Sequence, residues 1–484
     1  MKKIRELKKS LRTAAVVTAI PVLLCACAVN VQTDGAERGA LRQTDEAQAD
    51  EGGAVQQTDE AQADKGGVVR EQDANVEPGN PGAKGGSSVE KTNEKNNSVI
   101  NLTANNNTIT CIDYAIKDYA PLREFCYALF GENTDRENPV LSPVSAYLAL
   151  SMVGMGAGGN TEAEFRSVLG EEDMTVFADD MMNTLPADTA DMTLAIANSA
   201  WISDSFDVNE EWVGSIKSFL DAEAFQTNIS SDAAMRGIND WVERNTNGLI
   251  QEMLEEPLDA MTRLALFNTV YFKAKWTVPF ETVDTHIEDF TLADGSVVET
   301  DMMNQHEKEL QYIANDFSEG VVLPYRESDL ALVALKPTGQ DDVRTVYEKL
   351  TNEVIHETLN GIQTETVNLK LPKFEITFDH VLNDSLQQMG LRDAFDGEKA
   401  DFDRLGQSED NIYISLVRQK AKIIVDEEGT EAAAATEVVL REMALEWPEH
   451  EPKDVYFNEP FLYIIMDMEK EIPLFIGIID NPTV

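Results

Sequence analysis

The apolar residues along the chain predict both helices and strands over its C-terminal three quarters. Apolar side chains recur every three to four positions, the spacing of an amphipathic helix, in residues 116–130, 143–155, 161–169, 209–221, 232–244 and 379–389. Apolar runs of strand length occupy residues 193–202, 264–272, 320–324, 330–335, 367–376, 412–425, 456–466 and 472–479. The two kinds of element interleave irregularly, without strand–helix–strand repeats. We therefore expect an α+β fold with mostly antiparallel β-sheets.

An alternating pattern of another kind follows the strand expected at residues 412–425. Every second residue is uncharged, and the charged residues up to Arg441 fall between them; the uncharged positions are Thr430, Ala432, Ala434, Thr436, Val438 and Leu440. Successive side chains of an extended chain point to opposite faces, so this segment could bury one face in a sheet. Alanine, however, is the best helix former and is depleted in strands. The pattern therefore leaves two alternatives, an Ala-rich surface helix or a loop that becomes a strand later.

Residues 1–26 have the layout of a secretory signal peptide. A basic start precedes an apolar stretch, residues 13–26, that is too short to span a bilayer comfortably. The stretch ends in Leu24-Cys25-Ala26-Cys27, which resembles a bacterial lipobox. This predicts a lipid on Cys27 and anchoring at the extracellular face of a bacterial cell envelope, or release from it. A plain cleaved signal and an uncleaved anchor are the alternatives.

Residues 27–110 are expected to form a disordered, acidic and Gly-rich tether. They contain a duplicated octapeptide, at residues 43–50 and 57–64, and the first aromatic residue of the chain is Tyr114. Such a composition cannot build an apolar core. The globular domain is therefore expected at residues 111–484. Its two cysteines, Cys111 and Cys126, could pair outside the cytoplasm, or Cys126 could be a buried free thiol.

Charge and motifs exclude several classes of function. The net charge is −48, and residues 111–484 carry 72 acidic against 26 basic side chains, which disfavours nucleic acids and heparin-like polyanions as partners. The five histidines lack metal-ligand spacing, and there is no nucleophile elbow or nucleotide-binding glycine motif. We expect no enzyme activity, no metal and no cofactor. A surface hydrolase is disfavoured because no nucleophile–base pair is evident.

Over residues 112–484 the chain resembles the serpins. The matching blocks occur in the family's order: Asn138–Ser145, Gly156–Glu162, Ile238–Val242, Asn245–Ile250, Phe267–Trp276, Leu371–Phe374, Leu386–Gly390, Phe457–Phe461 and Asn481–Thr483. The resemblance implies a serpin fold, with about nine helices around mostly antiparallel sheets. It also implies an exposed reactive-centre loop at about residues 427–454, and a monomer.

The resemblance gives the alternating segment a role. The proximal hinge of the loop would comprise Glu427, Glu428, Gly429, Thr430, Glu431, Ala432, Ala433, Ala434, Ala435 and Thr436. A serpin of the inhibitory type is a suicide substrate of serine, or of cysteine, endopeptidases. The protease cleaves the loop, which inserts into the main sheet and traps the acyl-enzyme. A non-inhibitory serpin, acting as a surface binding protein or decoy substrate, is the alternative. Large or charged inward hinge residues would signal it, and there are none.

The family's usual spacing, 14 positions beyond Gly429, places the cleaved bond between Met443 and Ala444. Met443 suits the apolar specificity pocket of chymotrypsin-like or elastase-like proteases. Leu440 has the same implication, whereas Arg441 would suit a trypsin-like protease. The segment before Phe457 is longer than usual, which leaves the register open by a residue or more.

Several further positions match structural sites of the family. Ser142, Ser145 and Asn268 align with the hydrogen-bonding cluster called the shutter, with Asn198 as a further candidate, and Trp276 aligns with the tryptophan of the breach. The shutter position expected to be histidine is Gln419. Because glutamine both donates and accepts hydrogen bonds, the network is expected to survive without a titrating group.

Overall fold

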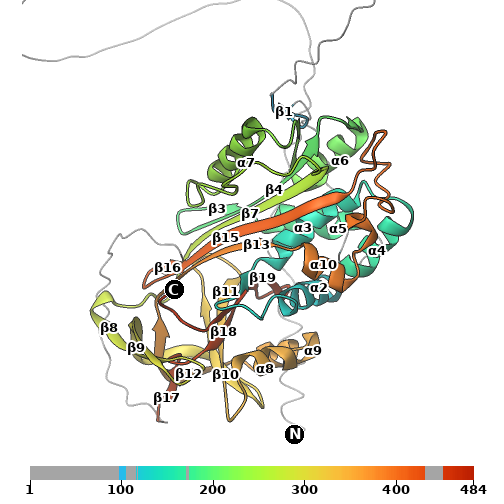
Figure 1. The fold of residues 1–484 in the computed structure, drawn as a ribbon. Helices are drawn as coiled ribbons and strands as arrows, with labels where there is room; N and C mark the ends of the chain where they lie inside the picture. The colour runs from blue at the N-terminus through green and yellow to red at the C-terminus, as the bar shows by residue number, and fades with distance from the viewer. Residues whose placement is uncertain (1–97, 105–115, 117, 171–173, 431–450) are drawn as a thin grey trace, which may run out of the picture. The chain divides into compact units, whose positions relative to one another are not determined.

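Two large β-sheets form the framework of the fold (Figure 1). The computed structural model describes residues 98–104, 116, 118–170, 174–430 and 451–484, all within one compact unit. The main sheet has eight strands in the order β1-β6-β4-β7-β16-β15-β13, with β3 beside β4. These strands are β1 (Ile100–Asn101), β3 (Ala187–Asp188), β4 (Met192–Ser203), β6 (Glu223–Thr227), β7 (Leu264–Lys275), β13 (Phe374–Val381), β15 (Ile414–Val425) and β16 (Gly429–Thr430).

The second sheet has nine strands in the order β17-β12-β9-β10-β11-β18-β19-β2, with β8 beside β9. They are β2 (Val140–Leu141), β8 (Thr285–Thr291), β9 (Val297–Ala314), β10 (Ser318–Pro324), β11 (Leu330–Pro337), β12 (Gln363–Pro372), β17 (Lys453–Tyr456), β18 (Phe461–Asp467) and β19 (Ile472–Ile479). A small third sheet pairs β5 (Asp207–Val208) with β14 (Gly406–Gln407). Neighbouring strands are antiparallel except for three pairs in the described chain, β4–β6, β7–β15 and β12–β17.

The described part of the chain contains nine α-helices. They are α2 (Ala120–Gly131), α3 (Pro143–Gly154), α4 (Gly159–Leu169), α5 (Met174–Thr184), α6 (Glu210–Leu220), α7 (Asp232–Asn245), α8 (Val343–Lys349), α9 (Asn352–Asn360) and α10 (Asn383–Met389). Helix α3 is buried at every position and contacts strands of both large sheets, which is typical of a helix in the centre of a core. None of the described helices has the length and apolar character needed to cross a membrane. The predicted α+β class, with mostly antiparallel sheets and about nine helices, is confirmed.

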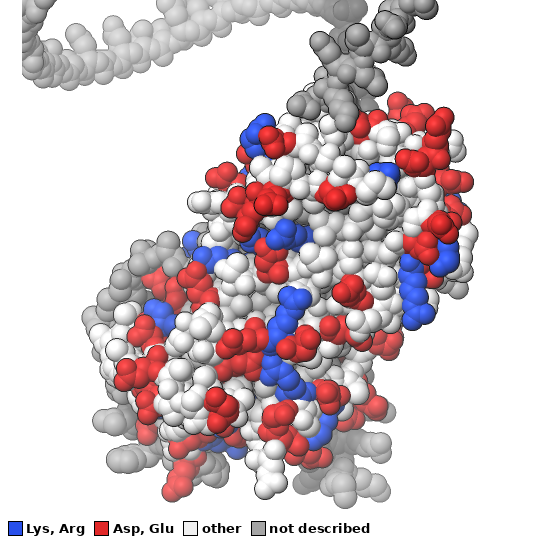
Figure 2. All heavy atoms as spheres, in the orientation of Figure 1, with Lys and Arg blue, Asp and Glu red and all other residues white. Residues whose placement is uncertain are grey.

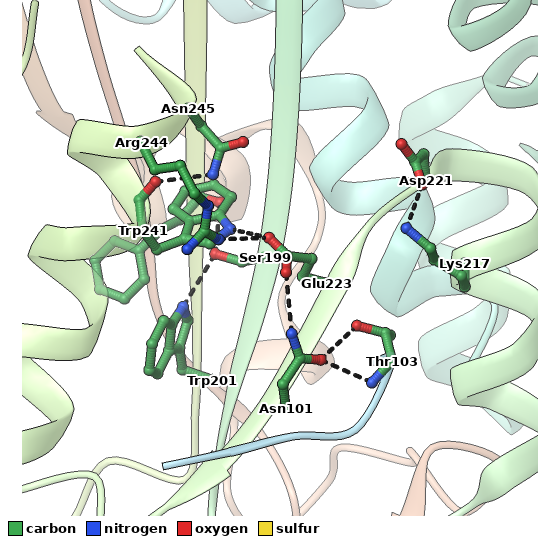
Figure 3. A network of polar contacts seen from close by, with 11 residues as sticks. Asn101, Thr103, Ser199, Trp201, Lys217, Asp221, Glu223, Trp241, Arg244 and Asn245 are labelled. Carbon is green, nitrogen blue, oxygen red and sulfur yellow. Dashed lines mark hydrogen bonds and ion pairs between the residues drawn. The ribbon is translucent and has the colours of Figure 1, made fainter. Parts of the chain in front are cut away.

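Helix α7 lies on one face of the main sheet, over β4 and β7 (Figure 1). Its Ile238, Trp241 and Val242 pack into an apolar cluster with Trp201 and Phe267 of the strands beneath. A carboxylate of β6 holds the helix at its side (Figure 3): Glu223 Oε2 accepts hydrogen bonds from Trp241 Nε1 at 2.6 Å and from Arg244 Nη2 at 3.0 Å. The helix therefore covers part of this face of the sheet, with a small apolar cluster beneath it.

Residues 98–104, which the sequence assigned to the tether, lie against the main sheet instead. Ile100 and Asn101 pair antiparallel with Gln226 and Phe225 of β6. The Asn101 side-chain amide donates to Glu223 Oε1 at 3.0 Å (Figure 3). Val99 packs on the apolar cluster beneath α7. Residues 100 and 101, which lie before the predicted boundary at residue 111, thus belong to the main sheet because this short segment pairs with a strand.

Several predicted element boundaries are wrong. The segment predicted as one strand at residues 367–376 is two, since β12 and β13 belong to different sheets. Residues 379–381 continue β13 rather than starting a helix, and α10 begins only at Asn383. The strand predicted at residues 456–466 is also divided, into β17 and β18. Among the longer elements, the hydrophobic pattern did not predict α5, α8, α9, β6, β8 and β9.

Candidate functional site

The predicted hinge enters the main sheet as the two-residue strand β16. Gly429 and Thr430 pair antiparallel with Lys275 and Ala274 of β7, and Thr430 also pairs with Val425 of β15. Farther along, β7 and β15 pair directly with each other as parallel strands, from Leu264 with Ile414 to Val270 with Ala421. At one end of the main sheet, β7 and β15 are thus separated by the start of the predicted hinge, and farther along they pair directly with each other.

A tight turn directs the chain from β15 into β16. The Asp426 amide donates to the carbonyl of Gly429 at 2.9 Å, and Asp426 Oδ1 accepts from the amides of Glu428 at 2.9 Å and Gly429 at 3.2 Å. A Cβ atom on Gly429 would lie 2.0 Å from the carbonyl oxygen of Ala274. Only glycine therefore fits where β16 meets β7.

The first inward-facing side chain of the hinge is that of Thr430, which is fully buried. Its hydroxyl lies 2.7 Å from the hydroxyl of Tyr325, and the Tyr325 ring stacks on Trp276 at a centroid distance of 4.7 Å. The Trp276 indole donates in turn to the carbonyl of Asp426 at 2.9 Å. The tryptophan that the sequence assigned to the breach thus contacts the hinge directly.

Glu427 fixes the base of the hinge to both large sheets. Its carboxylate pairs with Lys373 Nζ at 2.9 Å and accepts from Thr285 Oγ1 at 2.8 Å. Burial opposes ionisation of this carboxyl, but the bonds with Lys373 and Thr285 outweigh burial and lower its pKa. Backbone bonds add to these contacts, since the amides of Trp276 and Phe280 donate to the carbonyls of Glu428 and Glu427, both at 2.9 Å.

Gln419 occupies the centre of the predicted shutter and is fully buried. Its Oε1 accepts from the amide of Ser142, and its Nε2 donates to the Ser142 carbonyl and to Asn268 Oδ1, each at 2.9 Å. Asn268 Nδ2 donates to Asn198 Oδ1 at 2.7 Å and to the Ser145 carbonyl at 3.2 Å. One network therefore joins β4, β7 and β15 to the start of α3.

The structure brings these shutter residues together, although the two serines take part through their backbones. The hydroxyls of Ser142 and Ser145 are buried without a partner among the described residues. Cys126 is a buried free thiol. The remaining predicted site residues lie outside the described residues: Cys27, Glu431, Ala432, Ala433, Ala434, Ala435, Thr436, Met443 and Ala444. Their roles stay predictions.

Three side chains that contact the predicted hinge were not predicted from the sequence: Tyr325, Thr285 and Lys373. Lys373 lies within the matching block Leu371–Phe374 and could have been noticed there. Nothing local in the sequence distinguishes Tyr325 or Thr285, because their role depends on contacts with residues more than a hundred positions away. No group of three or more His, Cys, Asp or Glu side chains in the described ranges is placed to hold a metal ion.

Comparison with known proteins decides the family. A family model described as "Serpin (serine protease inhibitor)" matches residues 121–482. The chain is a serpin. It is 30% identical to mouse neuroserpin over 364 residues, which cover 72% of this chain and 86% of neuroserpin. It is 34% identical to a serpin-like protein of Thermococcus kodakarensis over 369 residues, covering 75% of this chain and 85% of that protein.

Among solved structures, this serpin is similar to the thermophilic serpin tengpin. The native state of tengpin gives a TM-score of 0.73 with 31% identity, covering 79% of this chain and 99% of tengpin. The latent state of tengpin gives a TM-score of 0.65 with 30% identity, covering 76% and 99%. The serpin described here is thus more similar in fold to the native state.

Proposed function

We propose that this serpin is a suicide-substrate inhibitor of serine endopeptidases. The observation that carries the proposal is the register of β16, in which the hinge has already started a strand between β7 and β15. That register predicts which residues of β7 and β15 the cleaved loop would pair with after insertion. Each residue added after Thr430 would pair one position further back along β7 and β15, antiparallel to both.

Continuing this register gives apolar neighbours to the small inward residues. Ala432 would lie between Phe272 and Ile423, and Ala434 between Val270 and Ala421. All four neighbouring side chains are buried. A charged or bulky side chain at either alanine would meet an apolar, closely packed environment, so the small residues of the hinge match the space expected for them.

The same register places Thr436, the next polar inward residue after Thr430, at the shutter. Six positions beyond Thr430, Thr436 would lie between Asn268 of β7 and Gln419 of β15. These two amides now bond each other at 2.9 Å, so insertion must break that bond. The Thr436 hydroxyl, which both donates and accepts, could bond to either amide in its place. The match of threonine to two amides supports insertion along this path.

Insertion would move an attached protease by about the length of the inserted strand. A strand of about 14 residues, from Thr430 towards Met443, spans roughly 45 Å at ~3.3 Å per residue. A protease attached as an acyl-enzyme at the cleaved bond would be carried along the sheet, and its active site would be deformed before hydrolysis. The native form must then be metastable and protected by a slow conversion.

We assign the cleaved bond to Met443–Ala444 and the target to chymotrypsin-like or elastase-like proteases. The serpin should therefore form a complex with chymotrypsin or elastase that survives denaturing gel electrophoresis. The mass of the released C-terminal fragment identifies the bond: a fragment starting at Ala444 supports the assignment, and one starting at Glu442 moves the site to Arg441 and the target class to trypsin-like proteases. Clean cleavage of the loop without a covalent complex, by all of these proteases, would instead favour the non-inhibitory alternative.

We further propose that the serpin is a lipoprotein on the extracellular face of a bacterial cell envelope. The lipobox-like sequence that ends at Cys27 supports this location. Cys27→Ser should release the protein from the membrane fraction of expressing cells. Recovery of the unsubstituted protein entirely in the soluble secreted fraction would contradict the anchor.

A further inference from the structure

The β8–β9 hairpin exposes apolar side chains, and the chain has no lysine or arginine between Trp276 and Lys308. Four of the eight large hydrophobic residues exposed in the described chain belong to this region: Val278, Val283, Ile287 and Val297. Ile287 is 69% exposed and Val283 is 80% exposed. Strand β8 pairs only with β9 among the described strands. The register places Ile287 and Val297 on the same face of the two strands, and β8 is an edge strand of the sheet. Exposed apolar side chains beside an edge strand are typical of a surface that meets a partner.

The charges on the same hairpin are of one sign. Between Trp276 and Lys308 the chain has eight acidic residues and no lysine or arginine. On the exposed face, Asp289 lies directly opposite Glu299, and Ile287 directly opposite Asp301. Like charges in directly opposed positions destabilise a sheet, and no cation of the described residues pairs with Asp289 or Glu299. Figure 2 shows how acidic side chains outnumber basic ones on the face that it presents.

The exposed face borders a hollow that suits a basic side chain. The hollow has a volume of about 560 Å³, and its lining includes Ile287, Glu299 and Asp301 of the hairpin together with Glu375 and Asp426. Lys373 is the one lysine or arginine in the lining, and its charge is already paired with Glu427 at 2.9 Å. A lysine or arginine could place its charge among these acids while its apolar stem packs on Ile287.

The hairpin also lies between the two attachments of the reactive-centre loop. At the first residue of β8, Thr285 bonds to Glu427, just before the loop, at 2.8 Å. At its last residue, the Thr291 amide donates to the carbonyl of Asn458, just after the loop, at 2.9 Å. Figure 1 shows β8 and β9 at the end of the molecule that carries β16 and β17. A protease that holds the loop in its active site must come close to this hairpin.

From these four observations we propose that the exposed face of β8 and β9 is a second docking surface for the target protease. It receives a basic, partly apolar segment of the protease surface beside the active-site cleft. The inference rests on the proposed inhibitory function and adds that the preferred target is cationic near its cleft. The acidic residues speed association, and Ile287 adds contact area once the complex forms.

The test measures binding of the full-length serpin to a cationic elastase whose catalytic serine is replaced by alanine. Because this protease cannot cleave the loop, only docking is observed. The triple variant Asp289→Asn, Glu299→Gln, Asp301→Asn should bind about tenfold more weakly at low salt, and the difference should shrink as salt screens the charges. The matched control, Asp240→Asn, Glu255→Gln, Glu256→Gln, changes the net charge equally at exposed acids on and after α7 and should bind like the unsubstituted serpin. Ile287→Thr should weaken binding a few-fold at every salt concentration.

Two results would overturn the docking surface. Equal loss of affinity in both triple variants would reduce the effect to net charge, and unchanged affinity in the hairpin variant would exclude the contact. Thermal unfolding separates docking from folding, because removing the opposed charges should leave the melting temperature of the hairpin variant unchanged or raised. Failure of the proposed inhibitory function would give a distinct result. Neither the unsubstituted serpin nor the hairpin variants would then form a covalent complex with any active protease.

Discussion

At the scale of single residues, His380 is the most unusual group near the shutter. It lies on β13 directly opposite Gln419, is 3% exposed, and stacks on Phe378 at a centroid distance of 5.2 Å. Its Nδ1 has no hydrogen-bond partner among the described residues. Burial, followed by the positive charge of Arg136, lowers the pKa of His380 from 6.5 to about 4, although Asp135 and Asp379 act in the opposite direction.

This lowered pKa predicts an acid-sensitive native form. Above pH 6.5 the imidazole is neutral in both the folded and the unfolded chain, so it contributes no pH dependence. Between pH 6.5 and about 4 the unfolded chain binds a proton that the folded chain does not, and stability falls by up to about 3 kcal/mol. His380→Phe removes this effect. The urea midpoint of the unsubstituted serpin should fall more steeply over this pH range than that of the variant; parallel curves would contradict the prediction.

The shutter residues that could be predicted from the sequence are those that match positions of the serpin family. Gln419, Asn268 and Ser142 were identified from aligned blocks and meet in the structure. His380 carried no such signal, since a lone histidine among apolar residues says nothing about the strand it will face. Its position beside Gln419 follows from the register of β13 and β15, which pairwise tertiary contacts determine.

At the scale of elements, the extent of β16 decides which residue should be substituted to test the insertion mechanism. Thr430 is already inside the sheet, so a charge there would disturb the native form as well as insertion. Ala434 is a better position for the substitution, because the register buries its side chain in the main sheet once the cleaved loop has inserted. Ala434→Arg must bury an unpaired charge, and a rise of about 1.4 kcal/mol in the barrier slows insertion roughly tenfold. Gel analysis should show cleaved serpin and free protease where the unsubstituted serpin gives a covalent complex.

The neighbouring alanine supplies the control for that experiment. Ala433 falls on the outward side of the same extended segment, so Ala433→Arg keeps its charge in solvent and should inhibit nearly as well as the unsubstituted serpin. Equal inhibition by the Ala434→Arg variant would rule out insertion in this register. Loss of inhibition in both variants would count against the alternation of the segment while leaving insertion possible.

Element boundaries could be predicted where the hydrophobic pattern is continuous. They were missed where the backbone bends within a strand or changes from one sheet to the other. Strands β4, β7 and β19 are largely apolar and mostly buried, and they were correctly predicted. Strand β9, with 18 residues, was missed because its buried positions do not alternate steadily, and Glu307 within it has a φ of +49°. Strands β12 and β13 were merged because only Lys373 separates them, and sequence alone does not show that the chain changes sheets there.

At the scale of the whole molecule, the net charge of −48 acts on every encounter. A general negative field attracts cationic proteases and repels nucleic acids and other polyanions, but it does not orient a partner. Orientation requires an uneven distribution of charge, and the segment between Trp276 and Lys308 supplies one because it has eight acidic residues and no lysine or arginine. Overall charge and local arrangement therefore have separate roles, the first in the rate of encounter and the second in its geometry.

The pairing of Ile100 and Asn101 with β6 has a consequence for solubility. Without it, β6 would be the border strand of the main sheet, with unpaired amides and carbonyls available to another copy of the chain. The short β1 pairs with this edge, and we expect the pairing to hinder self-association through β6. A form beginning at residue 105 should form oligomers in light-scattering measurements, whereas a form beginning at residue 98 stays monomeric. Adding a peptide of residues 98–104 should restore the monomer, and a monomeric 105–484 form without the peptide would show that β6 needs no cover.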